Sequence, residues 1–266
     1  MMARLLVLGL VWVLTGCGTL STGRGWGQDA LTSVSWQRVQ RAAHNAFFDL
    51  QTVLPAAGAI IFAASDLDDQ TSEWAVEHTP LFGSVQNAQD ASDYLRATLW
   101  VEAGVTALAT PSGADAKSWL LSKGKGLAVE LAAIGVTSGI TSGLKQVTDR
   151  SRPDDPMNTL SFPSGHASSA FAASTLANRN LDALAMPMGI KRPLQVGNLL
   201  LATGVAWARV EGGRHFPSDV LAGAALGHFL SAFIHDAFLG LPDTNRFHLI
   251  ILPAKDSTQV EVSFSF

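Results

Sequence analysis

The 266-residue chain has little cysteine, little charge and no excess of basic residues. Its single cysteine, Cys17, excludes a disulfide within the chain. Charged residues make up 15% and hydrophobic residues 47%, which excludes a largely disordered polypeptide. The net charge of -4 provides no basic surface, so no nucleic-acid partner is expected. The length suffices for one well-buried domain but not for two ordinary ones.

Long apolar stretches without interruption are also scarce. The strongest candidate for a membrane span, residues 126–144, contains Glu130 and several Ser, Thr and Gly residues, and Glu102 interrupts the stretch 97–110. Helices that are apolar nearly all round can also be buried members of a compact bundle. These features favour a peripheral, lipid-anchored bundle, with a polytopic membrane protein as the alternative.

The N-terminus has the pattern of an export signal. A short basic start precedes a ten-residue apolar run, residues 5–14, which is too short to span a bilayer. The run ends in Leu14-Thr15-Gly16-Cys17, which resembles the bacterial lipoprotein cleavage box. The resemblance implies acylation of Cys17, with an ordinary signal peptide as the alternative. Gly18, where Asp is absent, is compatible with delivery to the outer membrane. We therefore expect a lipid-anchored envelope protein facing the periplasm, with its functional site at a membrane surface.

The pattern divides the chain into four parts. Residues 1–16 are expected to be the signal peptide, 17–44 the lipidated cysteine and a tether, 45–240 a single domain and 241–266 a tail. The domain is predicted to be all-α, a compact helical bundle. Apolar residues at helical spacing predict helices near 35–64, 88–110, 126–148, 166–178, 195–210 and 218–238.

The tail has a different period. Residues 247–252 form a short apolar run, and after a break the apolar residues alternate with polar ones from 259 to 266. This pattern predicts a short C-terminal β-hairpin. Two strands cannot close a barrel, so we expect the hairpin to pack on the helical domain.

The first group of candidate functional residues is Lys145-x6-Arg152-Pro153. A separation of seven residues is close to two helical turns, so both cations can face the same direction, and Pro153 ends the helix. A guanidinium beside an ammonium suits a tetrahedral oxyanion. The alternative is a basic helix end paired with neighbouring aspartates.

The second group is Pro163-Ser164-Gly165-His166, which precedes a helical run. Ser164 is expected to cap that helix, and Gly165 permits close approach of a ligand. Because free amides at a helix N-terminus attract anions, phosphate oxygens could lie against Ser164 and Gly165. His166 could then donate a proton to a leaving-group oxygen. A capping turn with an incidental histidine is the alternative.

The third group is Arg209-x5-His215-x3-Asp219. Arg209 ends an apolar helix, and the next helix starts near Pro217. A spacing of four would bring His215 and Asp219 to one helix face. The carboxylate would fix the tautomer and leave the other ring nitrogen free to attack. A plain His–Asp capping contact is the alternative.

Together, in this order and at these spacings, the three groups resemble the signature of the type 2 phosphatidic acid phosphatase (PAP2) superfamily. This superfamily also includes bacterial acid phosphatases and vanadium haloperoxidases. The one departure is Ala208, where the signature has Ser. The resemblance covers about residues 45–240 and implies the helical bundle of PAP2 and acid phosphatase type.

The resemblance also implies roles for the matched residues. Lys145, Arg152 and Arg209 would bind phosphoryl oxygens, assisted by Ser164 and the Gly165 amide. His215 would attack phosphorus and form a phosphohistidine, Asp219 would orient it, and His166 would protonate the leaving group and then activate water. Three fixed cations can stabilise phosphoryl transfer without a metal, and no other Asp/Glu/His cluster in the sequence suits a divalent ion. No cofactor or metal is therefore expected.

The expected activity is hydrolysis of a phosphomonoester or diphosphate. A lipid anchor beside an apolar domain favours an amphiphilic, lipid-linked substrate. A vanadate-dependent haloperoxidase is one alternative, disfavoured because those enzymes are usually much longer. A catalytically inactive envelope scaffold is another, and the complete set of catalytic positions argues against it.

Overall fold

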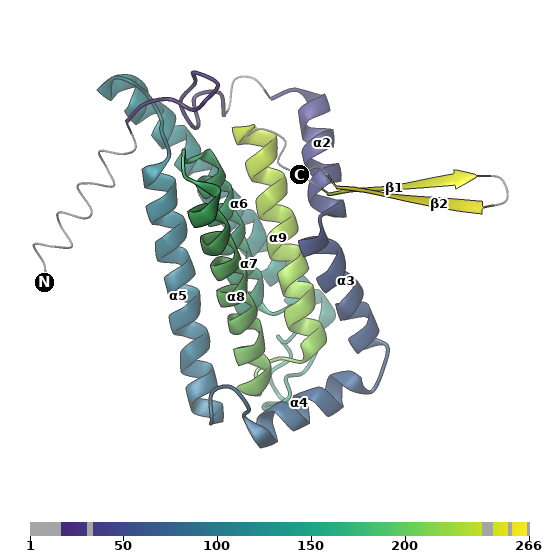
Figure 1. Cartoon of the computed structure of the whole chain (residues 1–266). Helices are drawn as coiled ribbons and strands as arrows, with labels where there is room; N and C mark the ends of the chain where they lie inside the picture. The colour runs from purple at the N-terminus through teal and green to yellow at the C-terminus, as the bar shows by residue number, and fades with distance from the viewer. Residues whose placement is uncertain (1–16, 31–33, 241–246, 255–256, 265–266) are drawn as a thin grey trace, which may run out of the picture.

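The computed structural model describes residues 17–30 and 34–240 and, for the backbone alone, residues 247–254 and 257–264. The described part contains eight helices, and the long ones lie side by side in a bundle while α4 lies across one end (Figure 1). This confirms the predicted all-α bundle. The helices are α2 (Trp36–Phe48), α3 (Leu50–Ala63), α4 (Leu67–His78), α5 (Val85–Ala109), α6 (Ala116–Thr148), α7 (Gly165–Ala183), α8 (Met188–Glu211) and α9 (Pro217–Leu239).

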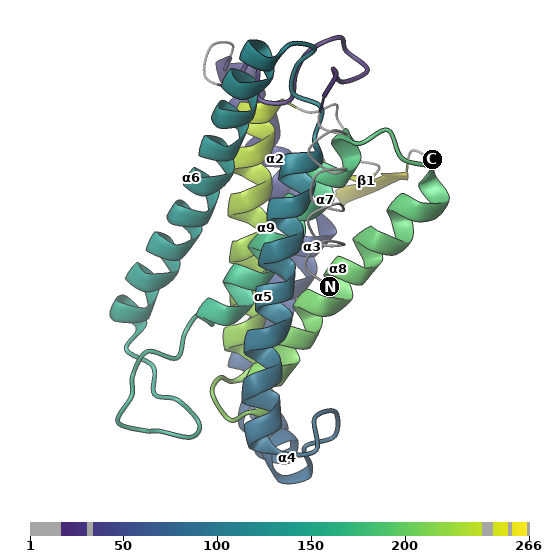
Figure 2. The same cartoon turned by 90° about the vertical axis from the view of Figure 1, so that its left-hand side faces the viewer.

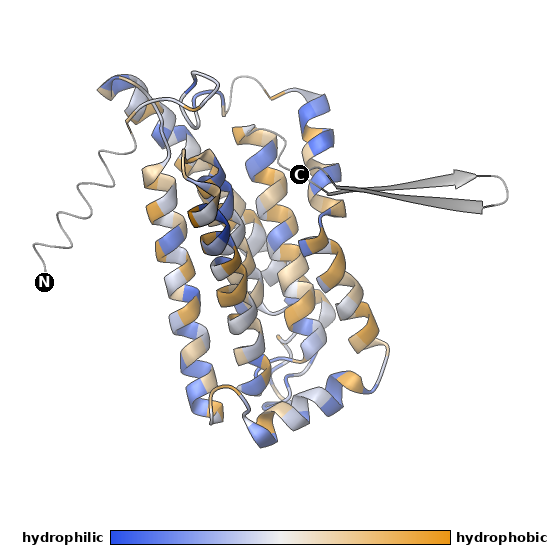
Figure 3. Ribbon diagram, in the orientation of Figure 1, coloured by the Kyte–Doolittle hydropathy of each residue, from blue (hydrophilic) through white to orange (hydrophobic). Residues whose placement is uncertain are grey.

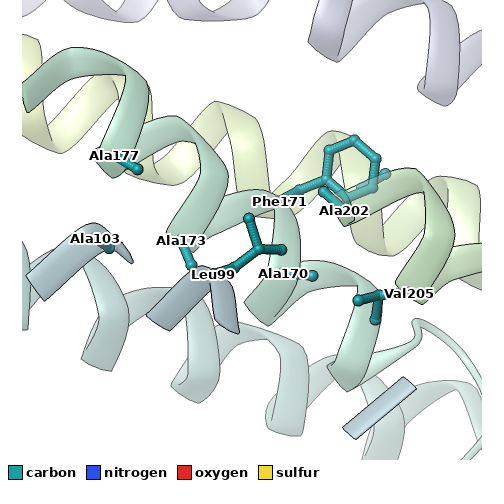
Figure 4. Close-up of a cluster of buried hydrophobic side chains, with 9 residues drawn as sticks. Leu99, Ala103, Ala170, Phe171, Ala173, Ala177, Ala202 and Val205 are labelled. Carbon is teal, nitrogen blue, oxygen red and sulfur yellow. The ribbon is translucent and has the colours of Figure 1, made fainter. Parts of the chain in front are cut away.

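Helix α7 forms the centre of the bundle. Most of its residues are buried, and many of them are alanines and serines. Side chains of this size let helix backbones approach one another closely while the interior stays densely packed. In one core cluster, Phe171 of α7 and its neighbouring alanines pack with Leu99 of α5 and Val205 of α8 (Figure 4). The small residues of α7 therefore explain how it contacts several helices at once.

The helix starts follow side-chain caps. Ser35, Asp49, Ser84, Asp115 and Ser164 each accept a hydrogen bond from a backbone N–H in the first turn of the helix that follows. These bonds satisfy amides that have no partner within the helix.

Two helical predictions need correction. The single helix expected over 35–64 is two helices, α2 and α3, bent by 50°. The break occurs because Asp49 caps a new helix, with its carboxylate accepting from Gln51 N at 2.9 Å. Helix α4 was not predicted because its sequence is mostly polar and lacks a clear apolar stripe.

Part of the expected tether is packed structure. Trp26 is fully buried, and a Cβ added to Gly126 of α6 would overlap its ring. Gly18 pairs with Gly113 through two backbone hydrogen bonds of 2.8 and 2.9 Å. The expected boundary between residues 44 and 45 falls inside α2. The segment around Trp26 therefore packs against the bundle, because burial of a tryptophan side chain lowers the free energy of the folded state.

The tail pairs as two antiparallel backbone strands, β1 (Phe247–Ala254) and β2 (Ser257–Phe264), with Phe247 opposite Phe264. Nothing is described of their side chains. The packing of this hairpin on the helical domain therefore stays a prediction.

Two of the described helices, α6 and α9, are long and apolar enough to cross a membrane, and the bent pair α2 and α3 would make a third span. Several of the long helices carry many apolar residues, drawn in orange in Figure 3. Leu54, Leu131 and Leu200 are each more than 60% exposed. Glu130, which argued against a span, is only 5% exposed, so its carboxylate faces the bundle interior and not the surface. The main sequence objection to a span in α6 therefore does not hold.

Candidate active site

The three predicted groups meet at one end of the bundle. Because neighbouring helices alternate in direction, the α6–α7 and α8–α9 connections lie at the same end as α4 (Figures 1 and 2). Ser164 N donates to Asp219 O at 2.9 Å, and His215 N donates to Arg209 O at 3.2 Å. Lys145 Cε lies 3.7 Å from the position that a Cβ on Gly165 would occupy. The fold thus joins groups that are up to 74 residues apart in the sequence.

The three candidate phosphate-binding cations lie around this point. Lys145 Nζ donates to the carbonyl oxygens of Leu160 and Ser161, at 2.5 and 3.2 Å. Arg209 Nη1 donates to Ser92 Oγ at 3.1 Å. The Nε atoms of Arg152 and Arg209 are shielded from solvent and have no hydrogen-bond partner in the described part of the chain. Each can therefore donate to an anion that enters the site.

The position of Arg152 has a different cause from the one expected. Helix α6 ends at Thr148, and Asp149 adopts a left-handed conformation with a φ of 46°. Arg152 lies beyond this turn, where its backbone N–H donates to Asn158 O at 3.0 Å. The connection between α6 and α7, and not two turns of helix, brings Arg152 towards Lys145.

His215 lies just before α9 and beside Asp219. Its Nδ1 is 3.7 Å from Asp219 Oδ2 and 3.5 Å from Ser161 Oγ. Asp219 Oδ2 also accepts from Ser161 Oγ at 2.6 Å and from Phe216 N at 2.9 Å. The expected pairing of histidine and carboxylate is therefore present. His215 itself is not helical, and a serine not predicted from the sequence belongs to the pair.

Burial holds His215 in its neutral form. It lowers the pKa of the imidazole to about 4, and the charges of Lys145 and Arg209 add to the effect, while the carboxylate of Asp219 opposes it. At neutral pH the ring therefore carries an unprotonated nitrogen, as a nucleophile requires.

His166 is the second residue of α7 and has its own carboxylate. Its Nε2 lies 2.8 Å from Asp93 Oδ1 of α5, 73 residues earlier. Burial and then the charge of Arg209 lower the pKa of His166 to about 4, whereas the hydrogen bond to Asp93 raises it. A bound phosphate would add negative charge and raise this pKa again. The site can thus supply a proton donor when an anion is present.

Ser164 caps α7 as expected, and its Oγ accepts from Ala167 N at 3.4 Å. Four residues that support the site were missed: Asp68, Asp93, Arg150 and Ser161. Arg150 occupies a variable position of the first motif, and no spacing in the sequence connects the other three to the motifs. Within the described ranges, no three His, Cys, Asp or Glu side chains come close enough to hold a metal ion.

Fold and site together define a helical bundle with a buried His–Asp pair beside several cations at one end. Residues 126–241, which contain all three groups, match the family model of the PAP2 superfamily. This segment of the chain is therefore similar to the PAP2 superfamily.

The chain is also similar to two known phosphatases. The chain is 34% identical over 107 residues to decaprenylphosphoryl-5-phosphoribose phosphatase of Mycobacterium tuberculosis, which covers 37% of this chain and 54% of that protein. It is 33% identical over 112 residues to lipid A 1-phosphatase of Porphyromonas gingivalis, which covers 42% of this chain and 22% of that protein. The chain thus spans about half or less of the length of these relatives.

Among solved structures, the fold resembles the transmembrane PAP2-type phosphatidylglycerolphosphate phosphatase from Bacillus subtilis, with a TM-score of 0.54. The sequences are 21% identical, and the match covers 74% of this chain and all of that one. This likeness shows a shared fold.

Proposed function

We propose that this protein is a metal-independent phosphatase that hydrolyses a phosphomonoester or diphosphate through a phosphohistidine. The observation that carries the proposal is the placement of the buried His215–Asp219 pair beside three cations. Two of those cations, Arg152 and Arg209, keep a shielded N–H without a partner in the described residues. A site of this kind binds a tetrahedral anion and holds a neutral imidazole beside it.

The reaction follows from these positions. His215 Nε2 attacks phosphorus, the bond to the leaving oxygen breaks, and His166 transfers a proton to that oxygen. A water then attacks the phosphohistidine, His166 takes a proton from the water, and phosphate leaves with His215 restored. The three cations stabilise the charge on the phosphoryl oxygens in both steps. Ser164 and the Gly165 amide, at the N-terminus of α7, would add hydrogen bonds to the same oxygens.

We further propose that the substrate is lipid-linked. Both relatives act, by their names, on phosphates carried by lipids. The apolar surface of α6 and its neighbours would hold the protein where such substrates occur. Contact between this surface and the acyl or isoprenyl chain of a substrate removes apolar area from water and therefore favours binding.

The location proposed is the bacterial cell envelope, with Cys17 acylated after removal of residues 1–16. The leader lies outside the described residues, but Cys17 itself is exposed and therefore accessible to an acylating enzyme. Delivery to the outer membrane, with the site facing the periplasm, stays a prediction from Gly18.

Phosphate release by purified protein tests the function. The detergent-solubilised chain should release phosphate from isoprenyl diphosphates, phospholipid phosphates and p-nitrophenyl phosphate, and EDTA should leave the rate unchanged. His215→Ala should abolish turnover, because the nucleophile is lost, while the unfolding temperature stays close to that of the wild type. Equal and negligible hydrolysis by both proteins on all three substrates would contradict the proposal.

A further inference from the structure

Arg150 joins two carboxylates that come from different helices. It lies in the connection after α6, at a variable position of the first motif. Its Nη1 donates to Asp219 Oδ1 at 2.7 Å, and its Nη2 donates to Asp68 Oδ2 of α4 at 2.7 Å. The guanidinium carbon lies 4.2 Å from the centre of the Phe216 ring. These contacts hold the guanidinium group at Oδ1 of Asp219, the carboxylate whose Oδ2 lies near His215.

Asp68 is held as firmly as Arg150. The residue is 4% exposed, and its Oδ1 accepts from Ser218 N at 2.8 Å. Ser218 Oγ donates to Asp68 Oδ2 and accepts from Arg150 Nη1 at 2.7 Å. A residue of the crosswise helix α4 is therefore tied to the first turn of α9, where Asp219 lies.

We propose that Asp68 is a positioning residue that acts on the nucleophile His215 through Arg150 and Asp219. The inference rests on the proposed phosphatase function. One part of its basis is geometric. His215 Nδ1 lies 3.7 Å from Asp219 Oδ2, farther away than any donor that makes a hydrogen bond to this carboxylate. The orientation of the carboxylate therefore depends on its hydrogen-bond partners, which are Ser161 and Phe216 at Oδ2 and Arg150 at Oδ1. Of these, Arg150 is the one that Asp68 holds in place.

The second part of the basis is the charge balance. As His215 attacks phosphorus its ring becomes positively charged, and the negative charge of Asp219 stabilises that change. Arg150 alone would cancel the charge of Asp219 at short range. Asp68 neutralises Arg150, so the three groups together keep one negative charge beside His215. The neighbouring cations Lys145 and Arg209 disfavour a positive charge on His215, and the remaining negative charge opposes their effect.

Asp68→Asn tests the proposal, because it keeps the shape of the side chain and removes its charge. We expect kcat to fall about 10-fold, as is typical when an outer partner of an orienting group is lost. KM should stay unchanged, because the three phosphate-binding cations keep their places. In single-turnover experiments the rate of phosphohistidine formation should fall by the same factor.

A double-mutant cycle separates positioning from general weakening of the fold. In an Asp219→Asn background, Asp68→Asn should cause no further loss of kcat, because the carboxylate through which Asp68 acts on His215 is already absent. If Asp68→Asn does not yield folded protein, Arg150→Lys replaces it in the same cycle. Lysine keeps the charge of Arg150 but lacks the planar fork that bonds two carboxylates.

Two matched controls use carboxylates outside the site. Asp69→Asn changes the exposed neighbour of Asp68 on α4. Asp236→Asn breaks the two-bond ion pair with Arg179, at 2.9 and 3.0 Å, near the far end of α9. Both variants should keep the wild-type kcat, although Asp236→Asn should lower stability.

Wild-type kcat in folded Asp68→Asn, or an equal loss in the wild-type and Asp219→Asn backgrounds, would overturn the inference. Absence of any turnover in the wild type would instead refute the proposed function. The two failures are therefore distinguishable.

Discussion

His215 is buried and the side chain of His166 is 26% exposed. Each has a carboxylate partner, but the two pairs differ. The partner of His215, Asp219, is fully buried and lies four residues away. The partner of His166, Asp93, has a side chain that is 61% exposed and comes from another helix. The first pair suits a group that must stay oriented, and the second suits a group that exchanges protons with water.

Asp93→Asn should impair proton donation by His166. The hydrogen bond to Asp93 raises the pKa of His166, so its loss should lower that pKa. A general acid is active while protonated, and activity is lost as the pH rises through its pKa. The alkaline limb of the pH profile of kcat/KM should therefore move to lower pH.

The leaving group provides a second measurement on the same variant. An alkyl phosphate needs a general acid and should lose about 10-fold or more in kcat. p-Nitrophenyl phosphate, whose leaving group needs little protonation, should lose little. Equal losses on both substrates would show that Asp93 does not act through His166. Asp90→Asn, an exposed change one turn earlier on α5, serves as the control.

At the scale of elements, the site depends on how closely α7 approaches α9. A Cβ added to Gly223 would lie 2.6 Å from Ser164 O, and one added to Gly227 would lie 2.1 Å from Ser168 O. The two glycines therefore let the backbone of α9 contact the backbone at the start of α7, which carries the second motif. Any side chain at these positions pushes the N-terminus of α7, with Ser164, away from α9.

Gly227→Ala should consequently destabilise the bundle by about 1–3 kcal/mol, because the methyl group meets backbone that cannot move aside. kcat should also fall, since Ser164 is displaced. Gly139→Ala is the matched control, because a Cβ there meets nothing within 4 Å. It should leave stability unchanged or raise it by about 0.5–1 kcal/mol through helix propensity. Thermal unfolding in detergent and phosphate release measure both effects, and similar stabilities of the two variants would contradict the packing argument.

At the scale of the whole molecule, Cys17 and the active site lie at opposite ends of the bundle. Gly18 pairs with Gly113, just before α6 begins, whereas Lys145 lies near the end of α6. Lys145 lies 29 positions after Ala116 on the same helix, which corresponds to about 44 Å. This exceeds the thickness of a bilayer core, about 30 Å. A lipid anchor near the domain in sequence therefore does not by itself bring the site to the same membrane surface.

If α6 spans the membrane, the two ends of the bundle should face opposite sides. Lys117→Cys places a thiol at the anchor end, and Met157→Cys, at a residue 91% exposed, places one at the catalytic end. In sealed membrane vesicles, an impermeant maleimide should label only one of them until the vesicles are opened. Labelled peptides are identified by mass spectrometry, so Cys17 can remain. Labelling of both positions in sealed vesicles would show that the bundle lies on one side.

The local sequence was enough to predict most of the helices, the cap at Ser164 and the candidate phosphate-handling residues. Apolar periodicity and capping residues such as Ser164 depend on neighbours a few positions away, and the three motifs each lie within eleven residues. These are short-range properties, so a linear reading can detect them.

Only the tertiary structure decided which residues support that chemistry. Asp93 reaches His166 across 73 residues, and Asp68 reaches Arg150 across 82. Their spacing carries no period, because packing between helices, and not the repeat within one helix, brings them together. The same holds for Trp26, whose burial against α6 turned an expected tether into part of the bundle, and for the distance between Cys17 and the site. Contacts of this kind depend on how the helices pack, which the order of residues along the chain does not reveal.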